Sequence, residues 1–167
     1  MTGESTCYNG GSVEYELDAS TLELDSTGVT ELTIIDNTVS MVGATGKAIK
    51  IQETPVNNKT YRYINISGGA VTTEKNSLKL TITGSAIITV TATTSKTDGT
   101  TSKVKLLDNT GDSVSESSDT LNAAKTTDGT AGEFKDVSVT ATTEGTYYIG
   151  GSSCGVRITK LKIEYTN

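Results

Sequence analysis

The chain has 167 residues and a formal net charge of −6, from 20 acidic and 14 basic side chains. That length suits one domain with its own hydrophobic core. Proteins that bind nucleic acids or anionic membranes do so through a strongly basic surface, and this acidic chain shows no such basic stripe. We therefore expect neither as a partner. Histidine is absent, which excludes Ser-His-Asp and Cys-His catalytic arrangements and imidazole metal sites.

Short segments of alternating apolar and polar residues follow one another along the chain. They lie at residues 13–17, 63–66, 78–82, 86–92, 103–106, 136–139 and 160–165. Thr, Val, Ile and Tyr dominate them, and turn signals such as Asp98-Gly99 and Gly150-Gly151 separate them. Such alternation gives each sheet one dry and one wet face, as in antiparallel sheets. The pattern predicts an all-β fold, a two-sheet antiparallel β-sandwich or jelly roll, with the first and last strands as neighbours.

We expect a single module at residues 11–167, preceded at residues 1–10 by a flexible N-terminal segment or an added sequence. No run approaches the ~18 apolar residues of a membrane span. Residues 108–133 form the longest polar stretch. We expect a long surface loop there, with a short strand near Val114 and a single turn at residues 121–125.

Cys7 and Cys154 are the two cysteines, and they lie near opposite ends of the sequence. The neighbouring first and last strands of a sandwich are compatible with a disulfide between them. Two unrelated thiols fit these positions equally well. Two thiols alone cannot form a structural zinc site.

Several turns are rich in the oxygen ligands that Ca²⁺ prefers. They contain Asp98, Asp108, Asn109, Asp112 and Asp128. Their spacing does not match the twelve-residue EF-hand loop, so we expect hairpin turns and no cofactor, with a structural calcium ion as the minority alternative.

Carboxylates are plentiful, but no pair stands out as catalytic. A glycosidase requires two carboxyl groups, one of them with a raised pKa. Glu14, Glu16, Glu23 and Asp25 have Ser and Thr neighbours and alternate along the chain, which is typical of a solvated face. We therefore expect no catalytic residues and no enzyme activity.

A few cations occupy positions that are compatible with ligand contact. Arg62 lies between Tyr61 and Tyr63 at the start of a strand, and Arg157 follows a glycine-rich segment. Lys75 precedes a strand, and Lys103 and Lys105 face outward from another. Because tryptophan is absent, a stacking platform for a sugar must come from tyrosine. Scattered charges that serve only solubility are the alternative.

Five stretches combine strands with glycines in a familiar order. They are residues 61–69 (YRYINISGG), 77–82 (SLKLTI), 86–92 (AIITVTA), 103–108 (KVKLLD) and 144–158 (EGTYYIGGSSCGVRI). Together they resemble the β-sandwich modules appended to secreted bacterial pectate lyases, and the last stretch resembles the closing hairpin and last strand of those modules. The resemblance covers roughly residues 30–165.

This resemblance implies a non-catalytic carbohydrate-binding module of a secreted bacterial protein. Such a module would target a covalently linked plant-cell-wall-degrading enzyme to pectin, chiefly homogalacturonan. Arg and Lys meet the galacturonate carboxylates through charge-assisted hydrogen bonds. We expect Arg62, Lys103 and Arg157 to line a shallow groove, with Lys75 and Lys105 in support and Tyr61 or Tyr63 facing the sugar.

The alternative function is a structural or adhesive sandwich of a bacterial cell-surface protein with no sugar site. Convergence of the five cations on one surface would favour the pectin-binding module.

Overall fold

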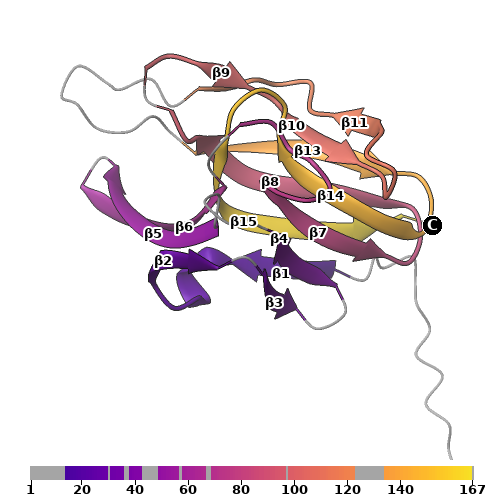
Figure 1. Ribbon diagram of the computed structural model, residues 1–167, viewed down its shortest axis with the longest axis horizontal. Helices are drawn as coiled ribbons and strands as arrows, with labels where there is room; N and C mark the ends of the chain where they lie inside the picture. The colour runs from indigo at the N-terminus through magenta and orange to yellow at the C-terminus, as the bar shows by residue number, and fades with distance from the viewer. Residues whose placement is uncertain are drawn as a thin grey trace, which may run out of the picture.

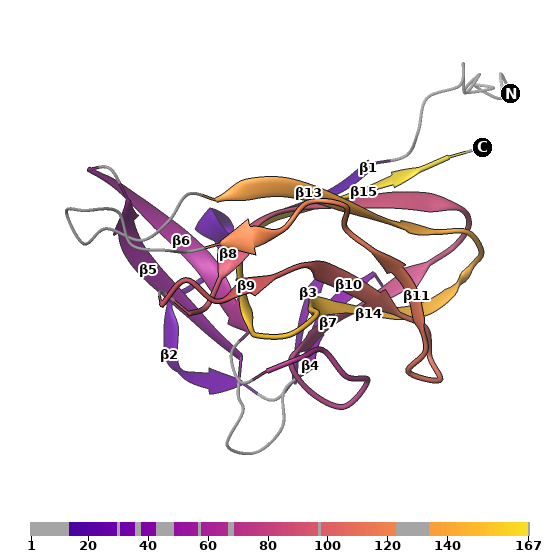
Figure 2. The same ribbon diagram turned by 90° about the horizontal axis from the view of Figure 1, so that it is seen from above.

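The computed structural model describes residues 14–29, 31–35, 38–42, 49–56, 58–66, 69–96, 98–122 and 134–166. Within these ranges the chain forms two antiparallel sheets that pack face to face (Figure 1). Figure 2 shows the two layers edge-on, with β8, β13 and β15 in one and β7, β10 and β14 in the other. The predicted all-β sandwich is confirmed. No helix in the described ranges is long and apolar enough to cross a membrane.

The first layer, sheet A, has seven strands in the described part of the chain. Its spatial order is β13 (Lys135–Ala141), β8 (Ala86–Thr94), β15 (Val156–Tyr165), β6 (Lys59–Ile66), β5 (Ile49–Val56) and β2 (Asp25–Val29), with β1 (Glu14–Asp18) also pairing with β15. The 3₁₀ helix η1 (Ala19–Thr21) follows β1.

The second layer, sheet B, has six strands within the same described ranges. Its order is β11 (Ser113–Glu116), β10 (Val104–Leu107), β14 (Gly145–Gly151), β7 (Ser77–Ile82), β4 (Val39–Val42) and β3 (Glu31–Ile35). A small separate pair joins β9 (Thr101–Ser102) to β12 (Leu121–Asn122).

The core lies between the two sheets, and alternating residues of each strand supply it. On β8, for example, Ile88 and Val90 are fully buried, whereas Thr89 and Thr91 between them are half-exposed on the outer face. This period of two is what the sequence pattern predicts. Burial of one apolar face per sheet therefore holds the sandwich together.

The first and last strands of the described chain are neighbours, as predicted. β1 pairs with the second half of β15, from Asp18 opposite Lys160 to Glu14 opposite Glu164. Figure 2 shows the two strands side by side. The pairing encloses the Leu17 side chain in the core.

The polar stretch at residues 108–133 is more ordered than predicted where the structure describes it. The expected short strand near Val114 is β11, which pairs with β10. Residues 121–122, where we expected the start of a single turn, instead form β12, because their backbone pairs with β9 and Leu121 is buried. Residues 123–133, and Asp128 among them, lie outside the described residues.

Cys154 is buried, and this burial raises the pKa of its thiol. Cys7 lies outside the described residues, so the choice between a disulfide and two thiols stays a prediction. The segment around Cys154 folds back tightly on β14. A Cβ atom at Gly151 would lie 1.8 Å from the Cys154 carbonyl oxygen, which is far inside van der Waals contact. Only glycine fits at this position.

We therefore expect Gly151→Ala to lower the free energy of unfolding by about 2–4 kcal/mol, because the backbone at Cys154 must shift. Gly84→Ala is the matched control. A Cβ atom there meets Tyr165 at an ordinary 3.9 Å, and the change in stability should stay within about 0.5 kcal/mol. Urea unfolding of both variants measures the difference, and equal stabilities would contradict the close approach.

Candidate binding site

A groove crosses the outer face of sheet A at the point where one pairing partner of β15 ends and another begins. β6 pairs with Val156–Ile158, and β1 begins to pair at Lys160. Thr159 lies between these segments, at a bulge in the ladder with β8. Since β6 leaves β15 at this bulge, a space of about 670 Å³ opens between β6 on one side and β1 and η1 on the other.

A smaller hollow of about 200 Å³ continues the groove along the sheet. It shares Thr91, Asp136 and Lys160 with the main groove and adds Glu16 and Lys162. The two spaces together form an elongated depression rather than a single closed pocket.

Aromatic side chains form one wall of the groove. The rings of Tyr61 and Phe134 lie 5.1 Å apart between centroids and are tilted by 31°. Phe134 also contacts Tyr63, at 6.4 Å. Tyr61 and Tyr63 are two residues apart on β6 and so lie on the same face. Tyr61 and Phe134 are half-exposed and line the groove, but Tyr63 is only 4% exposed.

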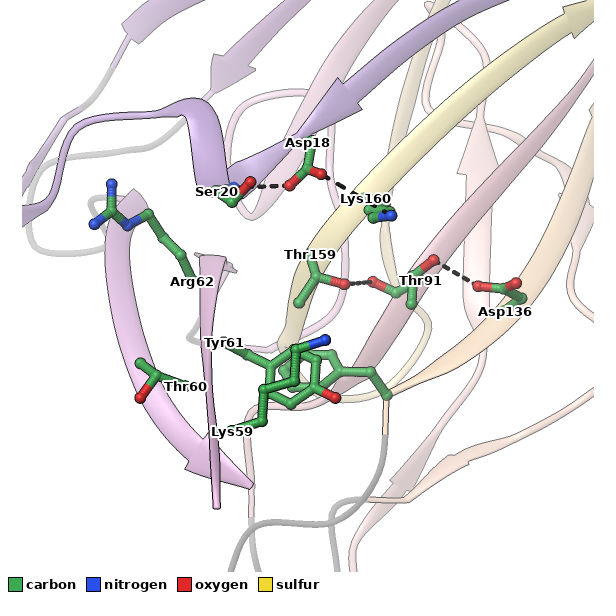
Figure 3. Close-up of a pocket in the computed structure, with 11 residues that line it drawn as sticks. Asp18, Ser20, Lys59, Thr60, Tyr61, Arg62, Thr91, Asp136, Thr159 and Lys160 are labelled. Carbon is green, nitrogen blue, oxygen red and sulfur yellow. Dashed lines mark hydrogen bonds and ion pairs between the residues drawn. The ribbon is translucent and has the colours of Figure 1, made fainter. Parts of the chain in front are cut away.

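A cation lies over each tyrosine of this wall. Lys59 Nζ is 5.0 Å from the centroid of the Tyr61 ring, and Arg157 Cζ is 5.0 Å from that of Tyr63. Both distances are within the range of a cation–π interaction. Figure 3 shows Lys59 beside Tyr61 on one side of the groove, with Asp18, Ser20 and Lys160 across from them.

The floor of the groove is polar. Thr159 Oγ1 donates to the Thr91 backbone carbonyl at 3.1 Å, and Thr91 Oγ1 donates to the Asp136 carboxylate (Figure 3). These bonds orient the hydroxyl groups, and the exposed side chain of Asp136 lines the groove.

The opposite wall begins where β1 ends in η1. Asp18 Oδ1 accepts a hydrogen bond from the Ser20 backbone amide at 2.9 Å, which caps η1. Lys160 Nζ lies 3.9 Å from Asp18 Oδ2. The hydrogen bonds from Ser20, with a smaller contribution from the Lys160 charge, hold the pKa of Asp18 below its usual value. Asp18 therefore stays ionised and paired at neutral pH.

Arg62 lies at the groove, but its guanidinium group is already engaged. Nε and Nη2 both donate to Glu53 Oε1, at 3.0 and 2.7 Å, and Nη1 donates to the Leu22 carbonyl. Glu53 is its cross-strand neighbour on β5. In Figure 3 the guanidinium points away from Tyr61 and Lys59. Arg62 thus ties β6 to β5 and to the segment after η1.

Arg157 is on the same face as the groove, beyond the aromatic wall. Its cross-strand neighbours are Asn65 on β6 and Thr93 on β8. Arg157 Nη2 donates a long hydrogen bond, 3.5 Å, to the Ser95 carbonyl. Arg157 Nε, Asn65 Oδ1 and Thr93 Oγ1 are buried and have no hydrogen-bond partner. The free donor of Arg157 is therefore enclosed rather than presented to the groove.

The three predicted lysines lie elsewhere. Lys105 is on β10 of sheet B, opposite Gly150, and Lys103 immediately precedes this strand, 4.0 Å from Glu116. Lys75 is exposed in the segment before β7. The five predicted cations therefore do not converge on one surface. Arg62 and Arg157 belong to sheet A together with Tyr61 and Tyr63, whereas the lysines belong to the side of sheet B. Their role in ligand binding stays a prediction.

The carboxylate of Asp108, in one of the oxygen-rich turns, is hydrogen-bonded within its own turn. Asp108 Oδ1 accepts hydrogen bonds from the Thr110 amide and hydroxyl and from the Asp112 amide. These bonds lower the pKa of Asp108. In the described ranges no group of three acidic or cysteine side chains is placed to hold a metal ion. The structural calcium ion stays an alternative prediction.

Sequence reasoning missed several groove residues, chiefly Lys59, Phe134 and Asp136. Lys59 precedes Tyr61 by two residues, a spacing that puts both on one face of a strand. Phe134 is the one phenylalanine of the chain and immediately precedes the alternating strand β13. Both signals were present in the sequence, but neither shows which strands lie beside β6 and β13.

No protein-family model and no curated protein matches this chain. Among solved structures it is similar to one described under glycan recognition by the cellulosome of Ruminococcus flavefaciens. The two are 13% identical, with a TM-score of 0.45, over 95% of this chain and 98% of that one.

Two further structures are similar at comparable levels. One holds a carbohydrate-binding module and the catalytic module of an endo-1,4-β-D-xylanase from Clostridium thermocellum, with xylohexaose. It is 13% identical, with a TM-score of 0.44, over 92% of this chain and 29% of that one. The other is a carbohydrate-binding module of lichenase 5A from Cellvibrio mixtus, with cellotriose. It is 12% identical, with a TM-score of 0.36, over 92% of this chain and 98% of that one.

The contacts of Arg62 lead to a stability prediction. Arg62→Ala should lower the free energy of unfolding by about 1–2 kcal/mol, because Glu53 and the Leu22 carbonyl both lose their donors. A double-mutant cycle with Glu53→Ala should give a coupling of about 0.5–1 kcal/mol, since the pair is only partly buried. Denaturant unfolding measures both values. A stable Arg62→Ala protein with zero coupling would show that Arg62 is free for another role.

Proposed function

We propose that this protein is a non-catalytic carbohydrate-binding module whose groove on sheet A holds a polysaccharide chain. The observation that carries the proposal is the pairing of an aromatic wall, Tyr61 with Phe134, with a polar floor in one elongated groove. Binding sites for small ligands are typically concave, with apolar rings for contact area and a few polar groups for orientation.

The chemistry of a sugar ring fits this arrangement. A pyranose has C–H groups on its ring faces and hydroxyl groups around its rim. The C–H groups pack on the electron-rich face of an aromatic ring. The rim hydroxyls can donate to carboxylates such as Asp136 and Asp18 and to the Thr91 hydroxyl oxygen, and they can accept from the ammonium group of Lys160.

The length of the groove favours a chain over a single sugar. The smaller hollow extends it along β8 and β15, past Lys160 to Lys162 and Glu16. A ligand that contacts the aromatic wall can therefore continue over the floor toward β1.

Within this proposal, pectin-type galacturonan is the ligand that the sequence resemblance implies. Each galacturonate ring has a carboxylate, and the groove offers Lys59, Lys160 and Lys162 as cations. The acidic charges of the protein as a whole oppose a polyanion only within about one Debye length, ~8 Å at physiological salt. Local contacts in the groove then decide the affinity.

The two carboxylates of the main groove have structural partners, which supports binding rather than catalysis. Asp18 caps η1 and pairs with Lys160, and Asp136 accepts from Thr91. A general acid needs a raised pKa, whereas the pKa of Asp18 is lowered. We further propose that the module is secreted by a bacterium and is linked to a catalytic domain that degrades plant cell walls, as the sequence resemblance implies.

Truncation of the aromatic wall tests the proposal. Tyr61→Ala and Phe134→Ala should each weaken binding of a polysaccharide by about tenfold or more, because each removes a partly buried aromatic anchor. Tyr148→Ala, on the outer register of sheet B, is the matched control and should leave affinity unchanged. Affinity gels and calorimetry with polygalacturonate, xylan and a soluble glucan would measure the effect.

For galacturonan, binding should also weaken as salt rises, since exposed ion pairs are screened. Salt-insensitive binding of a neutral chain would keep the carbohydrate-binding module and exclude pectin. Failure of the wild type to bind any of the three polysaccharides would overturn the proposal and favour the structural or adhesive sandwich.

A further inference from the structure

Lys59 differs from the other cations of the groove because it contacts an aromatic ring, whereas they pair with carboxylates. Arg62 pairs with Glu53, Lys160 with Asp18, and Lys162 with Glu164. Among the described residues, no carboxylate lies within ion-pair distance of Lys59 Nζ, whose contact is the ring of Tyr61. A ligand carboxylate could therefore meet Lys59 without displacing an acidic side chain of the protein.

Lys59 also covers the surface that a sugar would need. Its ammonium group lies over the Tyr61 ring at 5.0 Å, and Phe134 packs against the same ring. Lys59 and Tyr61 are two residues apart on β6, so the strand itself keeps them on one face. A sugar that stacks on Tyr61 from the groove must first move the ammonium group aside.

The cost of that movement depends on the charge of the sugar. A neutral sugar breaks the cation–π contact and offers the ammonium group only hydroxyl oxygens, which water supplies equally well. An acidic sugar offers a carboxylate, and the ammonium group exchanges an aromatic ring for a charge-assisted hydrogen bond.

We propose that Lys59 is a specificity-determining residue, which disfavours neutral chains on Tyr61 and binds the carboxylate of an acidic sugar there. This inference rests on the proposed function, because it assigns a role within the same groove. It names uronate-containing chains as the preferred ligand class and one side chain as the reason.

The test compares an acidic and a neutral oligosaccharide on the same variants. Lys59→Ala should weaken binding of a galacturonate hexamer by about three- to tenfold, because an exposed charged contact is lost. The same variant should tighten binding of cellohexaose or xylohexaose by about two- to fivefold, because Tyr61 is uncovered. Lys59→Arg retains a cation over the ring and should keep the wild-type preference.

Lys79→Ala is the matched control. Lys79 is also a strand lysine with a tyrosine, Tyr148, as its cross-strand neighbour, but it belongs to sheet B. Its removal changes the net charge equally and should alter neither affinity. If Lys59→Ala and Lys79→Ala change the two affinities equally, Lys59 acts only through the net charge of the protein, and the inference is overturned.

The free protein offers a readout that does not depend on a ligand. The side-chain methylene protons next to Lys59 Nζ should show an upfield ring-current shift in NMR spectra, and Tyr61→Leu should abolish it. Absence of the shift in the wild type would overturn the stacked geometry.

The outcomes also separate this inference from the proposed function. A wild type that binds a polysaccharide, with a Lys59→Ala variant of unchanged acidic-to-neutral affinity ratio, overturns the role of Lys59 alone. A wild type that binds no polysaccharide overturns both.

Discussion

The backbone pairing of β15 is the constraint on which the rest of this structure depends. One edge of the strand is fully occupied by β8, but the other edge is shared, first by β6 and then by β1. Two strands cannot occupy the same stretch of an edge, so β6 must leave where β1 arrives. The bulge at Thr159 marks this exchange. Bulges twist and bend a sheet locally and often adjoin functional sites. The groove is thus a result of the hydrogen-bonding pattern and is lined by whichever side chains face outward there.

The ion pairs around the groove follow from the same arrangement. In the pairing of β1 with β15, Asp18 lies opposite Lys160. In the pairing of β5 with β6, Glu53 lies opposite Arg62. Cross-strand neighbours of opposite charge satisfy one another. The acidic and basic side chains around the groove are therefore largely paired with one another, and few remain available to a ligand.

The part of this fold that could be predicted follows from the alternation of apolar and polar residues, because a period of two is visible in the sequence of any single strand. It placed Ile88 and Val90 in the core and Thr89 and Thr91 outside it, and it indicated that Lys105 faces outward. It does not show which sheet an outward residue belongs to. That depends on pairings between segments far apart in the sequence, such as β15 with β1. Lys105 faces outward as predicted, but it belongs to sheet B, whereas Arg157 belongs to sheet A. The hydrogen bond from Arg62 to the Leu22 carbonyl could not be predicted for the same reason, because the two residues are forty positions apart in the sequence.

Phe134 has a consequence for the outer face of sheet A. It immediately precedes β13, yet its ring contacts Tyr61 and Tyr63 on β6, with β8 and β15 lying between these strands. Strands in a sheet are about 4.8 Å apart, so three spacings separate β13 from β6 by about 14 Å on a flat sheet. The side chain of Phe134, which lies just before β13, and those of the two tyrosines on β6 close this distance across the outer face of the sheet, so the aromatic contact links β13 to β6. Rings that already hold one another in place lose little conformational freedom when a ligand packs against them, and such pre-organisation would favour the binding proposed above without additional contacts.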